Sequence, residues 1–317
     1  MYPKMHTDFK RIAMIGKKYN SVIEIMEAFS NKEGCIAYLE NLRWPDGVVS
    51  PYDSDSKVYK CKGSQYKCKN TGKDFNVRTG TIFDGTKVSL RKWMVAIWLM
   101  TTGKKGISSY QLARTIGVTQ KTAWFMAHLI RACYLQPEEA LSGVVQSDET
   151  FIGGKNRNRH WDKKVPNSKG RAHIDKVPVL GLVEQGGRLI TCVIPDTTQH
   201  SITPLILRHV ARGSMLYTDE WHGYGKVKRL YDHAFVDHSR NQYVNGSVTT
   251  NAIEGFWSIV KRSVIGVYHK VSRRHLQRYM DELTWLRNFR KESNGLRFNL
   301  LLCNMERKLT YKMLVHG

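Results

Sequence analysis

Two carboxylates interrupt an apolar strand near the middle of the chain, and no other stretch constrains the fold as strongly. Val144 and Val145 begin the strand, Asp148 and Glu149 break its apolar pattern, and a Gly-Gly turn follows Ile152. A carboxylate within a β-branched strand is costly unless another group pairs with it. The stretch therefore predicts either a binding site, with a metal ion as the first candidate, or the exposed edge of a strand.

Two more acids occupy comparable places downstream. Asp219 ends a short apolar run, 71 residues (219 − 148) after Asp148, and Glu254 follows 35 residues (254 − 219) later in a predicted helix. Each also fits a structural role, because Asp219 could cap a helix and Glu254 could close a capping box that starts at Asn251. The individual acids therefore do not decide between catalysis and structure.

The order of predicted elements favours catalysis. Residues 139–292 read as three antiparallel strands, a helix, a fourth strand, a small helix, a fifth strand and terminal helices. This order is typical of an α/β (α+β) ribonuclease-H-like domain, in which acids on the first strand, the fourth strand and a later helix converge. Asp148, Asp219 and Glu254 fit these places, and Asp281 or Glu282 is an alternative third acid. Two Mg²⁺ ions about 4 Å apart bind such carboxylates and support phosphodiester chemistry.

Charge points to a polyanionic partner. The formal net charge is +23, which favours nucleic acid first and an anionic membrane surface second. The sequence contains no apolar run of about 18 residues, so no membrane span is predicted. The six cysteines are scattered, which predicts a reducing, intracellular location. The stretch after Gly154 is rich in Lys and Arg, which predicts an arm that contacts phosphates. The alternative is a solvated loop. Its candidate DNA contacts are Lys155, Arg157, Arg159, Lys163 and Lys164.

Residues 86–138 predict a helix-turn-helix. Ser108 or Ser109 starts one helix, Gly117 ends it, and Thr119 caps the next. In that motif the start of the second helix faces the bases, so Gln120 and Lys121 are predicted to contact bases and Thr119 a phosphate. The alternative is a helical hairpin that only packs.

Residues 45–85 predict a small β-ribbon that follows an N-terminal helical segment, 1–44. Such ribbons are usually held by zinc between two CxxC pairs. Here those pairs fall on Ser50 to Asp53 and on Cys68 to Thr71, so Cys68 and at most Cys61 remain as thiolate ligands. Structural zinc needs four ligands, which argues against zinc in this ribbon. Residues 293–317 are read as a C-terminal tail.

The chain resembles the DDE-type transposases of the bacterial insertion-sequence group related to Merlin elements, which carry an ISXO2-like transposase domain. The matching stretches keep their order along nearly the whole chain. They are residues 77–93, 106–131, 148–155 (DETFIGGK), 217–224 (YTDEWHGY), 238–246, 251–282 (beginning NAIEGFW) and 309–312.

The resemblance implies an activity. It implies binding to the terminal inverted repeats of an element, strand cleavage that exposes 3′-hydroxyls, and joining of these ends to target DNA. It implies Asp148, Asp219 and Glu254 as ligands of two Mg²⁺ or Mn²⁺ ions, and Asn251 as the asparagine typical of the motif. It also implies a homodimer or higher assembly on DNA, in the cytoplasm or nucleoid, or in the nucleus if the source is eukaryotic.

Departures from the family pattern keep other functions open. The family's zinc-ribbon cysteines fall on Ser50, Asp53 and Thr71, a usual histidine falls on Thr249, and Leu286 and Phe289 stand at two positions usually occupied by arginine. One alternative is an inactivated or domesticated copy that binds DNA without cutting it. Another is a structure-selective nuclease on the same fold.

Overall fold

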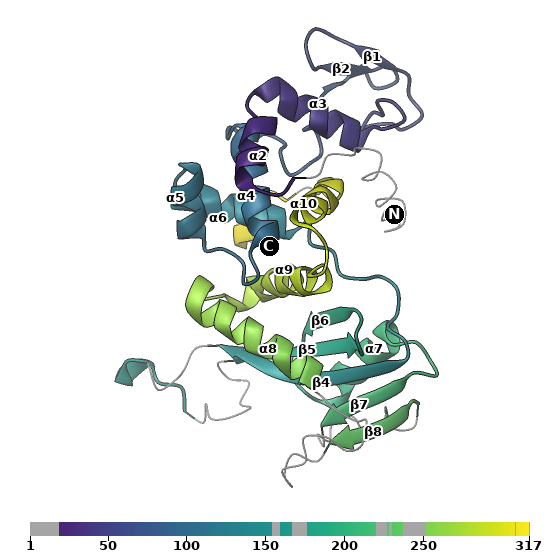
Figure 1. The fold of residues 1–317 in the computed structure, drawn as a ribbon, viewed down its shortest axis with the longest axis vertical. Helices are drawn as coiled ribbons and strands as arrows, with labels where there is room; N and C mark the ends of the chain where they lie inside the picture. The colour runs from purple at the N-terminus through teal and green to yellow at the C-terminus, as the bar shows by residue number, and fades with distance from the viewer. Residues whose placement is uncertain are drawn as a thin grey trace. The chain divides into compact units, whose positions relative to one another are not determined.

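The computed structural model describes residues 19–153, 159–166, 176–219, 227, 230–236, 251–307 and 309–316, with residues 219, 235 and 236 described by their backbone only. The chain divides into two compact units (Figure 1). The first contains the described residues up to Gly103, Ile107–Leu135 and those from Lys291 onward, and the second contains Lys104–Gly106 and the described part of Gln136–Arg290. The five-part division drawn from the sequence stays a prediction.

The first unit combines the predicted ribbon with helices. The ribbon has three short antiparallel strands in the order β1-β2-β3. They are β1 (Val58–Lys60), β2 (Tyr66–Cys68) and β3 (Asp74–Phe75). The helices are α2 (Val22–Ala28), α3 (Lys32–Arg43), α4 (Leu90–Thr102), α5 (Ser109–Ile116), α6 (Gln120–Arg131), α10 (Asn294–Cys303) and α11 (Tyr311–His316).

Local sequence explains the helix boundaries in this unit. The Ser108 hydroxyl accepts a hydrogen bond from the backbone N–H of Gln111 at the start of α5, and Thr119 does the same for Thr122 at the start of α6. Gly117 ends α5 in the left-handed conformation, with φ of 62°. The α5–turn–α6 arrangement therefore follows the predicted caps. Before α3 the cap is Asn31, whose side chain accepts a hydrogen bond from the backbone N–H of Gly34.

The C-terminal residues belong to the core of the first unit. Phe298 of α10 is fully buried and lies 5.9 Å and 6.0 Å, between ring centroids, from Tyr19 and Phe29. Tyr38 of α3 joins this aromatic cluster, and its hydroxyl donates to the Asn299 side chain at 2.5 Å. The C-terminal tail predicted from the sequence is therefore wrong for α10, because Phe298 is a core residue of this unit.

The second unit is built on a five-stranded sheet with the order β6-β5-β4-β7-β8. Strands β4, β5 and β6 are antiparallel neighbours, whereas β7 runs parallel to β4, and β8 parallel to β7. This order and these directions agree with the ribonuclease-H-like arrangement predicted from the sequence. The strands are β4 (Val144–Gly153), β5 (Lys176–Glu184), β6 (Leu189–Val193), β7 (Met215–Asp219) and β8 (Asp232–Val236).

Helices cover both faces of this sheet (Figure 1). On one face, Ile202 and Ile206 of α7 (Gln199–His209) pack against Val145 and Leu216. The other face packs against α8 (Asn251–Ser263) and α9 (Leu276–Asn288). Short helical segments complete the unit: η2 (Trp161–Lys163), the π-helix η6 (Val264–Tyr268) and η7 (Arg273–His275). Among the described residues, no helix is long and apolar enough to cross a membrane.

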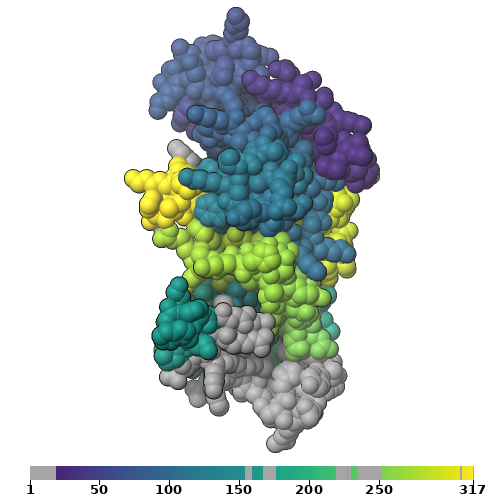
Figure 2. Space-filling view, turned by 90° about the vertical axis from the view of Figure 1, so that its left-hand side faces the viewer, coloured from purple at the N-terminus to yellow at the C-terminus, as the bar shows by residue number. Residues whose placement is uncertain are grey.

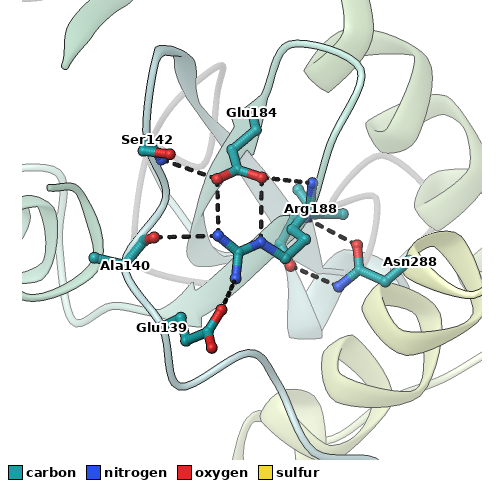
Figure 3. A network of polar contacts seen from close by, with 7 residues as sticks. Glu139, Ala140, Ser142, Glu184, Arg188 and Asn288 are labelled. Carbon is teal, nitrogen blue, oxygen red and sulfur yellow. Dashed lines mark hydrogen bonds and ion pairs between the residues drawn. The ribbon is translucent and has the colours of Figure 1, made fainter. Parts of the chain in front are cut away.

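A polar network fixes the chain as it enters β4 (Figure 3). The Arg188 guanidinium donates to both oxygens of Glu184, to Glu139 and to the backbone carbonyl of Ala140. The Glu184 carboxylate also accepts from the backbone N–H of Ser142 at 2.9 Å. Because Glu184 and Arg188 flank the β5–β6 turn, the network ties that turn to the segment that leads into β4.

Candidate functional site

Two of the three predicted acids lie on neighbouring parallel strands at matching positions. The β4–β7 ladder pairs Val144 with Met215 and ends with Gln146 opposite Tyr217, a constant offset of 71 residues (215 − 144 = 71). Asp148 and Asp219 have the same offset (219 − 148 = 71), so each lies two residues beyond the last paired position. They therefore stand where the two parallel strands cease to pair, beside the carboxyl end of β7, and open α/β sheets bind ligands outside such strand ends.

Strand alternation places Asp148 on the α8 face of the sheet. Val145 packs on the α7 side and Ile152 on the α8 side, so even-numbered positions of β4, including 148, face α8. In β7, Leu216 faces α7, which assigns Tyr217 to the α8 face. Glu149 takes the opposite face of β4. The side chain of Asp219 lies outside the described residues.

A buried glutamine connects β4 to the start of α8. The Gln146 side-chain oxygen accepts hydrogen bonds from the backbone N–H groups of Ala252 at 3.2 Å and Ile253 at 3.4 Å. Gln146 is only 2% exposed and lies two residues before Asp148 on the same face. It thus satisfies N–H groups that a helix start leaves without intrahelical partners. The sequence analysis did not identify Gln146. A polar residue within the apolar run of β4 was the feature that could have indicated it.

Gly181 lets α8 approach the sheet closely. It pairs with Asp148 across the β4–β5 ladder. A Cβ atom at Gly181 would lie 2.5 Å from Cζ2 of Trp257 and 2.6 Å from Cδ1 of Ile253. Only glycine therefore fits beneath α8 at this position, and the first turn of α8 lies over the sheet beside Asp148.

Glu254 and Asn251 both lie in that first turn. Asn251 is the first residue of α8, and both side chains are exposed. Glu254 directly follows Ile253, whose backbone is bonded to Gln146 and whose side chain covers Gly181. The third predicted acid therefore belongs to the segment that is fixed beside Asp148.

The available ligands are carboxylate oxygens, which suit Mg²⁺ or Mn²⁺. Among the described side chains, no group of three or more His, Cys, Asp or Glu residues is close enough to hold a metal ion. The Asp219 side chain is not among these described side chains. The fit to a divalent ion is therefore argued from the register of β4 and β7.

The alternative third acids lie against another strand. Asp281 of α9 accepts hydrogen bonds from Gln136 at 2.6 Å and Gln277 at 2.8 Å, and both glutamines also donate to the carbonyl of Thr191 in β6. Burial raises the pKa of Asp281 to about 6, against the opposing effect of the two glutamine hydrogen bonds. Glu282 is fully buried. Since β6 is separated from β4 by β5, Glu254 fits the site beside Asp148 better.

In α5 and α6, the predicted DNA-contacting side chains make contacts within the first unit. Thr119 caps α6, the Gln120 amide donates to the Ser109 hydroxyl at 2.9 Å, and the Lys121 ammonium lies 5.2 Å from the ring centroid of Tyr311 in α11. Thr119 and Lys121 are exposed, and Gln120 is half-buried. A shallow groove beside them is lined by Tyr110, Ala113, Arg114, Gly117, Val118, Thr119 and Gln120. Sequence reasoning missed Tyr110 and Arg114, which are exposed on α5.

Of the five predicted arm residues, three lie within the described segment 159–166. Lys163 and Lys164 are exposed, and Arg159 is half-buried. Lys155 and Arg157 lie outside the described residues.

The ribbon gathers hydroxyl groups around its one buried cysteine. Cys68 is fully buried, and burial alone raises the pKa of its thiol. Hydrogen bonds from the side chains of Ser50, Ser56 and Thr71 and from the Thr71 backbone overcome this effect and lower the pKa of Cys68 to about 6. Asp53 accepts from the Asn70 side chain at 2.8 Å. Serine, threonine and aspartate in this ribbon thus form a hydrogen-bonded cluster.

Comparison with known proteins gives the class of this chain. Residues 140–288, which contain the whole five-stranded sheet with α7, α8 and α9, match the family model of the ISXO2-like transposase domain. This match supports an insertion-sequence DDE-type transposase and confirms the resemblance drawn from the sequence.

Individual relatives are consistent with this assignment. A protein in the transposable element ISH50 of Halobacterium salinarum is 26% identical over 268 residues, covering 80% of this chain and 90% of that protein. A transposase-like protein of Haemophilus influenzae is 25% identical over 104 residues, covering 31% of this chain and 79% of that protein. A crystal structure of a pre-cleavage Mos1 transpososome aligns over 98% of this chain and 100% of that chain at 10% identity, but its TM-score of 0.23 supports no argument.

Proposed function

We propose that this chain is a DNA transposase that binds the terminal inverted repeats of an insertion element and cleaves and joins DNA strands with Mg²⁺ or Mn²⁺. Asp148, Asp219 and Glu254 are the proposed metal ligands and catalytic acids. The observation that supports the proposal is the shared 71-residue offset, because it gives Asp148 and Asp219 matching backbone positions on neighbouring parallel strands.

The chain's own residues have distinct roles in this proposal. Two bound divalent ions would stabilise charge on the attacking and leaving oxygens of a phosphodiester. Asp148 and Asp219 supply carboxylates from a rigid sheet, and Glu254 supplies one from α8. Gln146 positions α8 through its bonds to the backbone of residues 252 and 253. Asn251 is proposed to contact the metal-bound phosphate region from the same turn.

Cleavage of terminal-repeat DNA in Mg²⁺ or Mn²⁺ tests the assigned acids. Asp148→Asn, Asp219→Asn and Glu254→Gln should each abolish nicking while leaving DNA binding in place. Glu149→Gln is the matched control, because it removes the neighbouring charge on the opposite face and should retain activity. Nicking by Asp148→Asn at the rate of the unmodified protein would refute the assignment.

DNA binding is proposed for two surfaces. The first includes Thr119, Gln120 and Lys121 at the start of α6, and the second is the basic arm with Lys155, Arg157, Arg159, Lys163 and Lys164. The net charge of +23 supports both. The Lys163→Gln/Lys164→Gln double variant should reduce the slope of log affinity against log salt by about 2 if each lysine neutralises one phosphate. Lys32→Gln, an exposed lysine of α3, should leave the slope unchanged.

The altered ribbon supports a second candidate function, DNA binding without cleavage by an inactivated or domesticated copy. Ser50, Asp53 and Thr71 occupy positions where a zinc ribbon has cysteines. If the chain binds terminal-repeat DNA but does not cut it, and a variant with cysteine restored at these three positions does cut it, the second function is favoured. Because transposition joins two ends, the first function also predicts a dimer or higher assembly on DNA.

A further inference from the structure

One tryptophan differs from the other described tryptophans in its exposure. Trp161 is 79% exposed, whereas Trp124 is half-buried and the others are at most 9% exposed, namely Trp44, Trp93, Trp98, Trp257 and Trp285. Burial of a large aromatic side chain is among the most favourable contributions to folding. The position of Trp161 is therefore not explained by packing within the described part of the chain.

The backbone around Trp161 is locally ordered by its neighbours. The His160 ring and the Asp162 carboxylate, on either side of Trp161, form a contact of 2.6 Å. The backbone N–H of Lys163 donates to the carbonyl of His160 at 3.0 Å, which closes the short helix η2. The pairing of the two flanking side chains with each other leaves the indole exposed. Figure 2 shows the described segment 159–166 as a teal group at the surface of this view.

Charge identifies the kind of partner that fits this side chain. Between residues 155 and 171 the sequence has seven Lys or Arg residues against the single acid Asp162. A phosphate backbone is attracted to such a segment, whereas a second copy of a chain with net charge +23 is repelled by it. An aromatic face in a basic segment is a typical platform for base stacking.

We propose that Trp161 stacks on an unpaired base of a DNA strand whose phosphates contact Arg159, Lys163 and Lys164. Within a duplex the faces of each base are occupied by its neighbours, so an indole can stack only on a base at a strand end, a nick or a single-stranded segment. This inference rests on the proposed function, because a strand-cleaving enzyme creates such bases. It adds a substrate-positioning residue outside the three acids and the helix-turn-helix.

The test compares two probes of equal length, an oligothymidylate and a blunt duplex. Trp161→Ala should weaken oligothymidylate binding roughly 5- to 150-fold, the range expected from loss of one stacked base. It should leave duplex binding unchanged. Trp161→Phe should restore most of the affinity, and Ile265→Ala, which removes another exposed apolar side chain (60% exposed), should change neither affinity.

Fluorescence gives a readout that a merely structural role would not change. Oligothymidylate should quench tryptophan emission of the unmodified chain, and this quenching should be lost in Trp161→Phe. Equal oligothymidylate affinities for the unmodified chain and Trp161→Ala would overturn the stacking role while leaving the proposed function intact. Failure of the unmodified chain to bind either probe would instead overturn the proposed function. A change in oligomeric state of Trp161→Ala, with DNA affinity unchanged, would replace stacking with a contact between copies.

Discussion

Gly181→Ala should displace α8 from the sheet and so separate the third acid from the other two. The added Cβ would lie 2.5 Å and 2.9 Å from two ring carbons of Trp257, and 2.6 Å from Cδ1 of Ile253. Trp257 is 3% exposed and Ile253 is fully buried, so neither side chain can move into solvent. Relief of the overlap therefore requires movement of the helix that carries Glu254.

The size of the effect follows from these distances. Carbon atoms in contact are normally about 3.5 Å apart or more, so α8 must move by roughly 1 Å (3.5 − 2.5). Overpacking of this kind costs about 1–3 kcal/mol of stability. A 1 Å misplacement of a catalytic group can lower a rate by about 10²-fold. Gly181→Ala should therefore lose far more cleavage activity than its remaining folded fraction explains.

Gly255→Ala is the matched control on the same helix. A Cβ at Gly255 would meet nothing within 4 Å, and alanine is favoured over glycine inside a helix by about 0.5–1 kcal/mol. This variant should be slightly more stable than the unmodified chain and should cleave normally. Urea denaturation measures the stabilities, and nicking of terminal-repeat DNA in Mg²⁺ measures activity. A Gly181→Ala variant with unchanged stability and cleavage would refute the close approach of α8 to β5 beside Asp148.

Three further changes test the polar contacts. The raised pKa of Asp281 means that the protonated acid stabilises the folded state fully below about pH 4, and that this stability is lost as the pH rises through about 6. Asp281→Asn should therefore raise the free energy of unfolding at pH 8, by up to about 3 kcal/mol (1.36 × (6 − 3.8)), but should not change it at pH 4. Equal effects at both pH values would contradict this. Burial alone would raise the pKa of Glu184, but its hydrogen bonds, chiefly from Arg188, lower it. Glu184→Gln should therefore destabilise the fold above about pH 5, and the destabilisation should become smaller as the pH falls. Urea denaturation across this pH range measures the effect. Thr71→Val should cost about 1 kcal/mol by removing a hydrogen bond to Cys68, whereas a chelator should not change the melting temperature; a chelator-induced decrease would indicate a metal in the ribbon.

The order and direction of the strands could be predicted because each strand carries its own signal. These signals are local features of the sequence. They are the alternation in β4, the Gln185-Gly186-Gly187 turn and the apolar run before Asp219. Together they predict the strands of the sheet and their sequence order, but not their register. The caps at Ser108 and Thr119 were predictable for the same reason, since a cap depends on residues only three positions apart.

The contacts that complete the candidate site depend on residues far apart in sequence. Gln146 meets the backbone of residue 252, a separation of 106 residues. Gly181 is restrictive only because α8 crosses the sheet above it. Likewise, no local pattern predicts that the Lys121 side chain lies over Tyr311. Such contacts follow from strand register and helix packing, which periodicity does not specify.

The ribbon and the sheet tolerate substitution differently, and this difference bears on whether the chain is active. In the ribbon, hydroxyl groups from Ser50, Ser56 and Thr71 bond directly to Cys68, so neutral side chains can hold together strands that a structural metal holds in related ribbons. Charge on divalent ions cannot be balanced by neutral side chains in the same way, because hydroxyls and amides supply no negative charge. In the proposed function, the changed ribbon positions therefore do not require loss of catalysis, whereas loss of Asp148 would. The presence of Asp148, Asp219 and Glu254 in the sequence and the restrictive Gly181 beneath α8 support the proposed active transposase over the proposed copy that only binds DNA.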